Sequence, residues 1–324
     1  MTVGRVVGVD AGATSTRALA VELDGTVIGR GTAGGGNPNS HPPELAGKRV
    51  AEAVRDALAP GGAGKVRACV LGMAGVSKFT DPEVVETFTA ALRHIGVTCP
   101  IGIVSDAEVA FASATAEPDG VVVIGGTGSI AARIAGHKMI SRVGGLGWML
   151  GDEGSAYWMG REAVRRTLRQ LQTGKTPSPL AEAVLFEALP GLTSVNEPKV
   201  ANRLIMAANA EPPIRLARFA SMVSTYLATD PVAAGIVAEA AELLAELAMA
   251  ARPADERTPI VLAGSVIGPA SPVGTALRAA LAECTPVPVL FAPDGAIGAA
   301  WLAALEVRPD APRPRTEPRP RTER

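Results

Sequence analysis

The sequence predicts an α/β protein built from two similar halves. Short apolar segments typical of buried strands alternate with longer Ala-rich segments of helical pattern. A strand, a turn of Gly, Thr and Ser, and a second strand occur in this order twice, at residues 5–23 and 121–134, which indicates an internal duplication. Hydrophobic residues form 47% of the 324 residues and aromatic residues 3%. This composition favours a closely packed enzyme over an aromatic-rich binding module.

Charge and cysteine content exclude several classes of partner. The formal net charge of −1 gives no electrostatic basis for binding nucleic acid or an anionic membrane. Cys69, Cys99 and Cys284 form no CxxC pair and no zinc spacing, as expected in a reducing compartment. The first residues run directly into a strand without a signal-peptide core, and no apolar run is long enough to span a bilayer. We therefore expect a cytoplasmic protein that binds neither nucleic acid nor membrane.

The first half opens with three predicted strands, at residues 5–10, 16–23 and 27–32. The turn at 11–15 exposes backbone N–H groups and hydroxyls that can cradle phosphate oxygens. Asp10 ends the first strand, where a hydrated Mg²⁺ could bridge its carboxylate to those phosphates. An ordinary tight hairpin explains the same turn equally well.

A glycine-rich loop at residues 33–40 precedes a predicted helix at 43–58. Asn37 or Asn39 in this loop could hydrogen-bond a polyol, although a solvated surface loop has the same composition. A strand at 66–71 and a helix at 81–94 then lead to an apolar strand at 101–104.

Asp106 follows this strand and is succeeded at once by an Ala-rich helix at 107–114. A carboxylate at the carboxyl end of a buried strand points into a crevice, where it can accept a proton from a substrate hydroxyl. Capping of the following helix is the alternative explanation, because Asp is common at helix starts. The phosphate-type turns elsewhere in the chain favour the catalytic interpretation.

The second half repeats the first, with strands at 121–124 and 130–134, a third strand ending at 141, and a Gly/Thr/Ser turn at 125–129. Two phosphate-cradling turns facing each other would hold a nucleotide from both sides. Residues 143–154 contain five glycines and cannot form a stable helix. Asp152 in this loop could hold sugar hydroxyls, or it could simply begin the helix predicted at 155–171.

The remainder is predicted to be mostly helical, with helices at 180–188, 199–210, 214–228 and 232–251. A strand at 259–263 is followed by Gly264 and Ser265, whose small size allows flat packing against adenine or ribose but also suits a simple βα turn. A helix at 272–281, a strand at 287–290 and a helix at 295–305 complete the fold. The Pro/Arg/Glu-rich tail, 308–324, is predicted to be disordered.

Five segments in this order resemble the motif series of the BadF/BadG/BcrA/BcrD ATPase family, and within it the chain is most similar to N-acetylglucosamine kinases. The segments are VGVDAGATSTRALAVELDG, VSDA, VVVIGGTGS, GDEGSAYWMG and VLAGSVIG. The most specific pair is GGTGS followed by GDEGSxYW. The resemblance covers nearly the whole chain except the tail.

The resemblance implies two ribonuclease H-like (actin-like ATPase) domains that flank a nucleotide and sugar cleft. Residues 1–116 would form the N-terminal domain, and residues 117–307 the C-terminal domain with a helical insertion. The implied activity is transfer of the ATP γ-phosphoryl group, with Mg²⁺, to the 6-hydroxyl of N-acetylglucosamine. A homodimer is expected, as in many relatives.

The resemblance also assigns roles to residues. Asp106 matches the catalytic base, and Asp10 matches the carboxylate that holds Mg²⁺ through water. The residues of the two phosphate turns are Gly12, Thr14, Thr127 and Gly128, and those of the adenosine motif are Gly264 and Ser265. The positions that contact the sugar are Asn37, Thr127, Gly145 and Asp152.

Two departures from the family pattern leave the sugar open. Leu146 stands where Trp is usual, with Trp148 two residues on, and Ala11 and Ala13 stand where glycines are frequent. A glucosamine kinase with the same mechanism is therefore an alternative. An iron–sulfur activator of 2-hydroxyacyl-CoA dehydratases is another, which the cysteine positions oppose. A non-catalytic sugar sensor is the third, opposed by the presence of both carboxylates and both phosphate turns.

Overall fold

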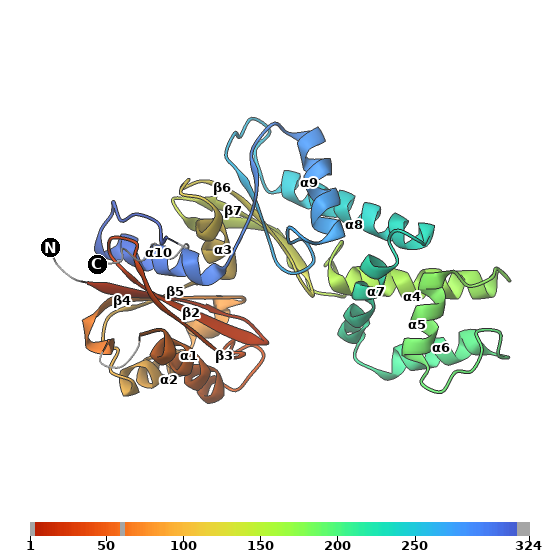
Figure 1. The fold of residues 1–324 in the computed structure, drawn as a ribbon, viewed down its shortest axis with the longest axis horizontal. Helices are drawn as coiled ribbons and strands as arrows, with labels where there is room; N and C mark the ends of the chain where they lie inside the picture. Colours follow the sequence, from red (N-terminus) through yellow and green to blue (C-terminus); the bar gives the residue numbers. More distant parts are fainter. Residues whose placement is uncertain (1–3, 59–61, 316–324) are drawn as a thin grey trace, which may run out of the picture. The chain divides into compact units, whose positions relative to one another are not determined.

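The computed structural model describes residues 4–58 and 62–315, in which helices and strands alternate along the chain (Figure 1). The chain folds into two compact units. Unit 1 contains the residues up to 118, residues 134–139 and the residues from 292 onward. Unit 2 contains residues 119–133 and 140–291.

Unit 1 is built on a sheet whose strands lie in the order β3-β2-β1-β4-β5. The strands are β1 (Arg5–Ala11), β2 (Ser15–Glu22), β3 (Val27–Gly34), β4 (Val66–Met73) and β5 (Ile101–Ser105). β1, β2 and β3 form an antiparallel meander, whereas β4 is parallel to β1 and β5 is parallel to β4. The carboxyl ends of β1, β4 and β5 therefore meet at one edge of the sheet.

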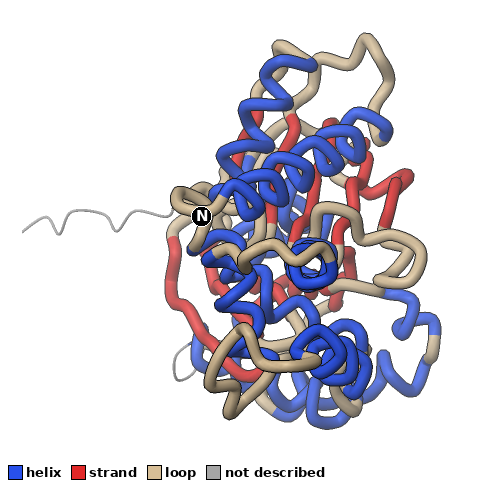
Figure 2. Tube along the Cα trace, turned by 90° about the vertical axis from the view of Figure 1, so that its right-hand side faces the viewer, coloured by secondary structure: helices blue, strands red, loops and turns tan. Residues whose placement is uncertain are grey.

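Helices cover both faces of this sheet (Figures 1 and 2). They are α1 (Pro43–Leu58), α2 (Pro82–His94), α3 (Asp106–Ala114) and α10 (Gly295–Val307), with short 3₁₀ helices η1 (Ala63–Lys65) and η2 (Val76–Thr80). Alternate residues of β1 point to opposite faces. Val7 and Val9 join the core under α1 and α2, whereas Val6 joins the core under α3 and α10. Gly8 has no side chain, and any Cβ there would collide with the α10 backbone at Ala300.

The sheet of unit 2 repeats this order, as β8-β7-β6-β9-β10. Its strands are β6 (Gly120–Gly125), β7 (Ser129–Ala135), β8 (Lys138–Gly144), β9 (Ile260–Ala263) and β10 (Val289–Phe291). β9 runs parallel to β6, and β10 parallel to β9. Within the described residues the chain thus has two five-stranded sheets with the same strand order, and the predicted duplicated α/β fold is confirmed.

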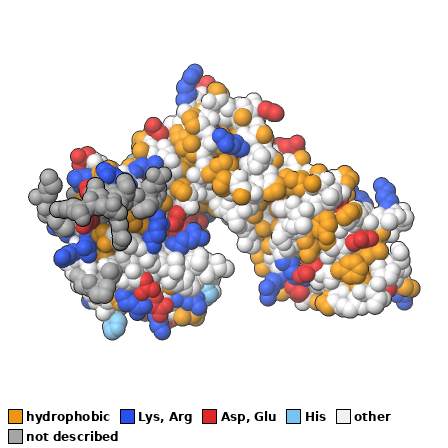
Figure 3. Space-filling model, viewed as in Figure 1, with side chains coloured by type: hydrophobic (Ala, Val, Ile, Leu, Met, Phe, Trp, Pro, Cys, Tyr) orange, Lys and Arg blue, Asp and Glu red, His pale blue; other side chains and the backbone are white. Residues whose placement is uncertain are grey.

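Unit 2 also carries the helices that lie between β8 and β10 in the chain. They are α4 (Ala156–Gln172), α5 (Pro179–Ala188), α6 (Val200–Ala210), η3 (Pro213–Phe219), α7 (Ala220–Thr225), α8 (Pro231–Ala250) and α9 (Pro272–Cys284). They share one hydrophobic core, in which Leu204, Phe219 and Leu244 are buried. Hydrophobic side chains also reach the surface of this unit (Figure 3). Phe186 and Met206 are among the exposed ones.

The C-terminal segment differs from the sequence prediction. Residues 308–315 lie against unit 1, although the sequence predicts disorder from residue 308, and residues 316–324 lie outside the described part. Trp301 donates its indole N–H to the carbonyl of Ala311 at 3.0 Å, and the Arg315 N–H donates to the carbonyl of Gly25 at 2.9 Å. Arg313 donates to the carbonyl of Ser113. These distant partners, which composition does not reveal, hold the segment.

Unit boundaries also differ from the predicted division at residue 117. α10 belongs to unit 1, together with residues 134–139 at the β7–β8 turn. The reason is packing: α10 is rich in Ala and Gly and lies closely on β1 and α3, where a Cβ at Gly298 would overlap the Val109 carbonyl. No helix in the described ranges is both long and apolar enough to cross a bilayer.

Candidate functional site

A cavity of about 430 Å³ lies in unit 1 where the carboxyl ends of the parallel strands meet. Asp10 follows the buried part of β1, and Asp106 follows β5 directly. The cavity brings together Asp10, Gly12, Asn37 and Asp106, which were predicted from the sequence, and also Asn39, the alternative to Asn37. Thr14 lies in the neighbouring turn but does not line the cavity.

Asp106 occupies the first turn of α3 without serving as its cap. Ser105 is the N-cap: its hydroxyl accepts from the Glu108 N–H at 3.2 Å, while the Glu108 carboxylate accepts from the Ser105 N–H at 2.6 Å. Ser105 rather than Asp106 therefore caps the helix. Its carboxylate accepts one bond from the Ala107 N–H at 3.0 Å and faces the cavity. Burial raises the pKa of Asp106, against the lowering effect of the backbone N–H groups.

Asp10 is a second carboxylate with a raised pKa. Burial raises its pKa from the ordinary 3.8 to about 6; nearby Arg17 opposes the rise, while Asp294 and Asp106 add to it. Arg17 stands directly across from Asp10 in the β1–β2 ladder. The site thus concentrates negative charge around Asp10, and Arg17 is the cation that opposes it there.

Asp294 is a part of this site that the sequence analysis missed. It caps α10 by accepting from the Ala296 N–H at 3.1 Å and forms ion pairs with Arg30 at 3.4 Å and Arg17 at 3.9 Å. Gly295 follows it, and a Cβ there would lie 2.7 Å from Asp10 Oδ2. An Asp-Gly pair before a small-residue helix was the only signal in the sequence, and it does not reveal the contact with β1.

The loop after β3 shapes another wall of the cavity. Asn37 is buried; its amide donates to the Ala74 carbonyl at 3.0 Å, and its side-chain oxygen accepts from the Asn39 N–H at 2.8 Å. His41 Nε2 lies 2.7 Å from the Ala13 carbonyl and ties the loop to the first turn. His41 was not predicted from the sequence.

In unit 2 the turn between β6 and β7 corresponds to the first turn of unit 1. The Gly126 N–H donates to the Gly128 carbonyl at 2.9 Å, which closes the turn around Thr127. The first residues of α4 anchor it, because the Ala156 N–H donates to the Gly126 carbonyl at 2.9 Å and the Tyr157 N–H to the Thr127 carbonyl at 3.2 Å.

Asp152 lies against this turn in a left-handed conformation, with φ of 61°. Its buried carboxylate accepts from the Ser129 N–H at 3.1 Å. Gly128 must lack a side chain here, since a Cβ would lie 2.6 Å from Asp152 Oδ1. A left-handed non-glycine residue with a buried carboxylate marks a position under local strain, which is typical of functional sites.

The glycine-rich loop also meets the turn. The Gly145 N–H donates to the Ser129 carbonyl at 3.0 Å, and Gly144, Gly145 and Gly147 all have positive φ. Leu146 between them is 63% exposed. Thr127, Gly128, Gly145 and Asp152, predicted from separate motifs, are therefore close neighbours in unit 2.

Gly264 and Ser265 follow β9, next to the end of β6. Gly264 has φ of 101°, and a Cβ there would overlap the Gly125 carbonyl. The Val266 N–H donates to that same carbonyl at 3.1 Å, and this bond holds the segment after β9 against the end of β6. Ser265 is exposed beside the β6–β7 turn, so the predicted adenosine motif and second phosphate turn lie together in unit 2.

The donor set of unit 1 fits a hydrated magnesium ion. Among the described residues there is no group of three or more His, Cys, Asp or Glu side chains that could enclose a metal. Mg²⁺ needs no such cage, because it keeps several waters and binds one or two carboxylates together with substrate phosphates. The mutual repulsion of Asp10, Asp106 and Asp294 is the charge arrangement that a divalent cation would relieve.

The chain matches a known family over most of its length. A model of the BadF/BadG/BcrA/BcrD ATPase family matches residues 7–303. The chain is 31% identical over 166 residues to an N-acetylmuramic acid/N-acetylglucosamine kinase of Clostridium acetobutylicum, covering 51% of this chain and 53% of that protein. It is 30% identical over 178 residues to an N-acetyl-D-glucosamine kinase of Dictyostelium discoideum, covering 50% and 54%. The chain spans about half the length of the curated relatives it matches.

Solved structures share the fold over nearly the whole chain. A candidate N-acetylglucosamine kinase from Chromobacterium violaceum has a TM-score of 0.70 and 25% identity, covering 94% of this chain and 100% of that one. A ROK family glucokinase from Streptomyces griseus, in complex with glucose and AMPPNP, has a TM-score of 0.53 and 21% identity, covering 93% and 99%. The expected two-domain actin-like ATPase fold is confirmed by these similarities.

Proposed function

The chain belongs to the BadF/BadG/BcrA/BcrD ATPase family, and we propose that it is an ATP-dependent amino-sugar kinase that phosphorylates the 6-hydroxyl of N-acetylglucosamine. The observation that carries the proposal is the pairing of Asp10 and Asp106 in one cavity, at the ends of parallel strands and next to a turn of small residues. The names of the relatives supply the sugar class.

In this proposal Asp106 is the general base. Ser105 caps the helix, so the Asp106 carboxylate is not needed as the cap, and its raised pKa makes it a stronger base. The 6-hydroxyl gives its proton to Asp106 as its oxygen bonds to the γ-phosphorus, and the bond to the ADP oxygen breaks. Phosphoryl transfer needs mainly positioning and charge stabilisation, so one well-placed base is sufficient.

Asp10 would hold Mg²⁺ through water. The metal supplies charge neutralisation for the phosphates when it is bound. Gly12 and Thr14 in the first turn, and Thr127 and Gly128 in the second, would donate N–H groups and hydroxyls to phosphate oxygens. Gly128 has no side chain, which leaves room for the Asp152 carboxylate beside the second turn.

The remaining contacts divide between nucleotide and sugar. Gly264 and Ser265 would contact adenosine. Asn37, Thr127, Gly145 and Asp152 would contact sugar hydroxyls, with Asn37 and Asp152 already fixed by their hydrogen bonds. Side chains that are fixed before substrate arrives lose little entropy on binding.

The decisive experiment is ATP consumption, followed by ADP detection, with N-acetylglucosamine, glucosamine, N-acetylmannosamine, glucose and no sugar. We expect the highest kcat/KM with N-acetylglucosamine and little turnover without sugar. Sugar-independent turnover, or none with any sugar, would contradict a sugar kinase.

Glucosamine kinase is the second candidate, and one observation favours it. Leu146 replaces the usual Trp and is exposed on its loop, which weakens the argument for a formed acetyl pocket. A preference for glucosamine in the same assay would support this candidate. The iron–sulfur activator is less consistent with the structure, because Cys69 is fully buried within β4 of unit 1.

A further inference from the structure

A second and larger cavity, of about 900 Å³, lies in unit 2 away from the proposed phosphate and sugar contacts. It runs along the carboxyl-terminal half of α4 and the beginning of α8. Its charged lining residues are Glu162, Arg165, Arg166, Arg169, Lys175 and Glu239. We call this the α4–α8 groove.

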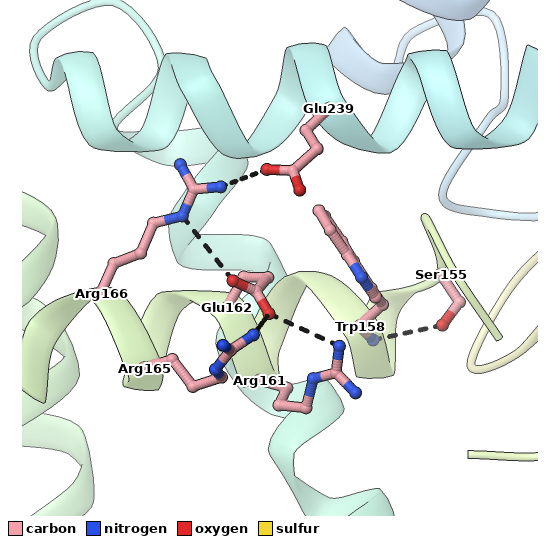
Figure 4. A network of polar contacts seen from close by, with 7 residues as sticks. All are labelled: Ser155, Trp158, Arg161, Glu162, Arg165, Arg166 and Glu239. Carbon is pink, nitrogen blue, oxygen red and sulfur yellow. Dashed lines mark hydrogen bonds and ion pairs between the residues drawn. The ribbon is translucent and has the colours of Figure 1, made fainter. Parts of the chain in front are cut away.

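The groove is organised around one buried carboxylate. The side chain of Glu162 is only 10% exposed and accepts from Arg165 Nη1 at 2.5 Å. Arg161 Nη2 lies 3.5 Å and Arg166 Nε 3.8 Å from the same carboxylate. Figure 4 shows the three guanidinium groups around Glu162. The carboxylate thus holds several arginines in fixed positions.

Arg166 also bridges the two helices. It pairs with Glu239 of α8 as well as with Glu162 of α4 (Figure 4). An arginine held by two carboxylates has lost most of its side-chain freedom before any ligand arrives. The ion-paired part of the groove is therefore preorganised.

The groove has a surplus of positive charge. Four of its lining residues are cationic and two are carboxylates, which leaves a surplus of two positive charges. Arg169 and Lys175 form no ion pair with any residue that the structure describes. The whole chain has a formal net charge of −1, so this concentration is local. Lys175 is placed at the rim by the turn after α4, where its N–H donates to the Gln170 carbonyl at 3.0 Å.

We propose that the α4–α8 groove binds a phosphate monoester dianion. A phosphate monoester carries close to two negative charges at neutral pH, which matches the surplus of the groove. Guanidinium groups match the geometry of phosphate oxygens and bind them through paired hydrogen bonds. The volume is within the range of about 300–1,000 Å³ that small-molecule sites occupy, which leaves room for a sugar-sized group behind the phosphate.

The backbone N–H groups at the start of α8 are not available to bind the phosphate. The N–H groups at the start of α8 are already occupied, because Asp230 accepts from Val232 at 2.7 Å and from Ala233 at 3.4 Å. The side chains of Arg169 and Lys175 are exposed and form no ion pair within the part of the chain that the structure describes. They are the groups that a bound phosphate would engage.

Calorimetric titration of the full chain tests the proposal, with glucose 6-phosphate, inorganic phosphate and glucose as probes. We expect saturable binding of glucose 6-phosphate and none of glucose at the groove. In the double variant Arg169→Gln/Lys175→Gln, the Kd for glucose 6-phosphate should rise at least about tenfold, because two charge-assisted contacts are lost. Inorganic phosphate that binds as tightly as the ester would identify free phosphate as the ligand; weaker binding would identify an ester.

The matched control is Lys48→Gln/Arg93→Gln, which removes two exposed cations from unit 1. Its Kd for glucose 6-phosphate should equal that of the unchanged protein, and circular dichroism should show both double variants folded. Unchanged binding in the Arg169→Gln/Lys175→Gln variant would overturn the proposal, because the phosphate would then bind elsewhere. Absence of saturable binding to the unchanged protein would overturn it as well.

Discussion

Asp106 is the residue on which the proposed chemistry depends most directly. We predict that Asp106→Asn lowers kcat by about 100- to 10,000-fold, because the amide cannot accept the hydroxyl proton. The Kd for ADP should stay within about threefold, since the proposed nucleotide contacts come from other residues. Steady-state kinetics and calorimetry measure the two quantities. An equal loss of ADP binding and kcat would argue against a role as base.

Replacing Asp10 is predicted to raise the stability of the protein while it abolishes activity. Its folded-state pKa of about 6 exceeds the ordinary 3.8, so the folded protein holds this proton more tightly than the unfolded chain does. Ionised Asp10 therefore costs folding free energy above pH 6, up to about 3 kcal/mol, and the cost disappears as the pH falls from 6 towards 3.8. Asp10→Asn should raise Tm at pH 7.5 without metal, show no gain near pH 4, and abolish activity.

The control for this prediction is Asp56→Asn, which removes an exposed carboxylate paired with Arg55. Such a surface pair contributes little, so the change should shift Tm slightly and similarly at both pH values. A lower Tm of Asp10→Asn at pH 7.5 would show that the Asp10 carboxylate stabilises the fold, and the proposed cost of its ionisation would be wrong.

The sequence holds a local signal that the sequence analysis did not use. The capping box of Ser105 and Glu108 can be read from residues three apart, and it leaves Asp106 free for another task. Asp294 could not be recognised in the same way. Its relation to Arg30 and Asp10 joins segments from opposite ends of the chain, and no local pattern records such a contact.

At the scale of the element, the start of α10 must approach Asp10 closely. We predict that Gly295→Ala lowers kcat/KM while changing stability by only about 1–3 kcal/mol, because its Cβ would lie 2.7 Å from Asp10 Oδ2 and displace that carboxylate. Kinetics with varied Mg²⁺ should show a raised Mg²⁺ requirement. Chemical denaturation measures the stability.

Two further glycines separate this effect from general damage. Gly64→Ala should change neither activity nor stability measurably, because no heavy atom lies within 4 Å of the added Cβ. Gly298→Ala should destabilise the protein without a specific Mg²⁺ effect, since its Cβ would overlap the α3 backbone at the Val109 carbonyl and has no contact with Asp10. If Gly295→Ala resembled Gly298→Ala in both measurements, the contact with Asp10 would have no special role.

Most helices and strands could be predicted because their signals are periodic and local. α1 begins and ends at the predicted residues, and Pro231 opens α8 after the cap Asp230. The segment 308–315 could not be predicted, because its proline-rich composition is typical of disorder. Its order comes from Trp301 and Gly25, and such tertiary partners are invisible in a window of sequence.

For the whole molecule, the duplication was readable but the division into units was not. Repeated strand–turn–strand patterns at residues 5–23 and 121–134 predict two similar sheets, and both have the same strand order. Unit 1, however, takes residues 134–139 and α10 from the second half of the chain. This exchange follows from the packing of small residues in α10 against β1 and α3, which is a property of the folded state rather than of local pattern.

Separate cores lead to a prediction about unfolding. Unit 2 has one core, and unit 1 has its own cores on the two faces of its sheet. We therefore expect calorimetry of the free protein to show two overlapping transitions, because two-state behaviour often fails when a chain has more than one core. Leu71→Ala in unit 1 and Leu244→Ala in unit 2, each at a fully buried position, should each cost about 2–5 kcal/mol and lower different transitions. A single transition lowered equally by both substitutions would instead mean that the chain segments shared between the halves make the two units unfold as one.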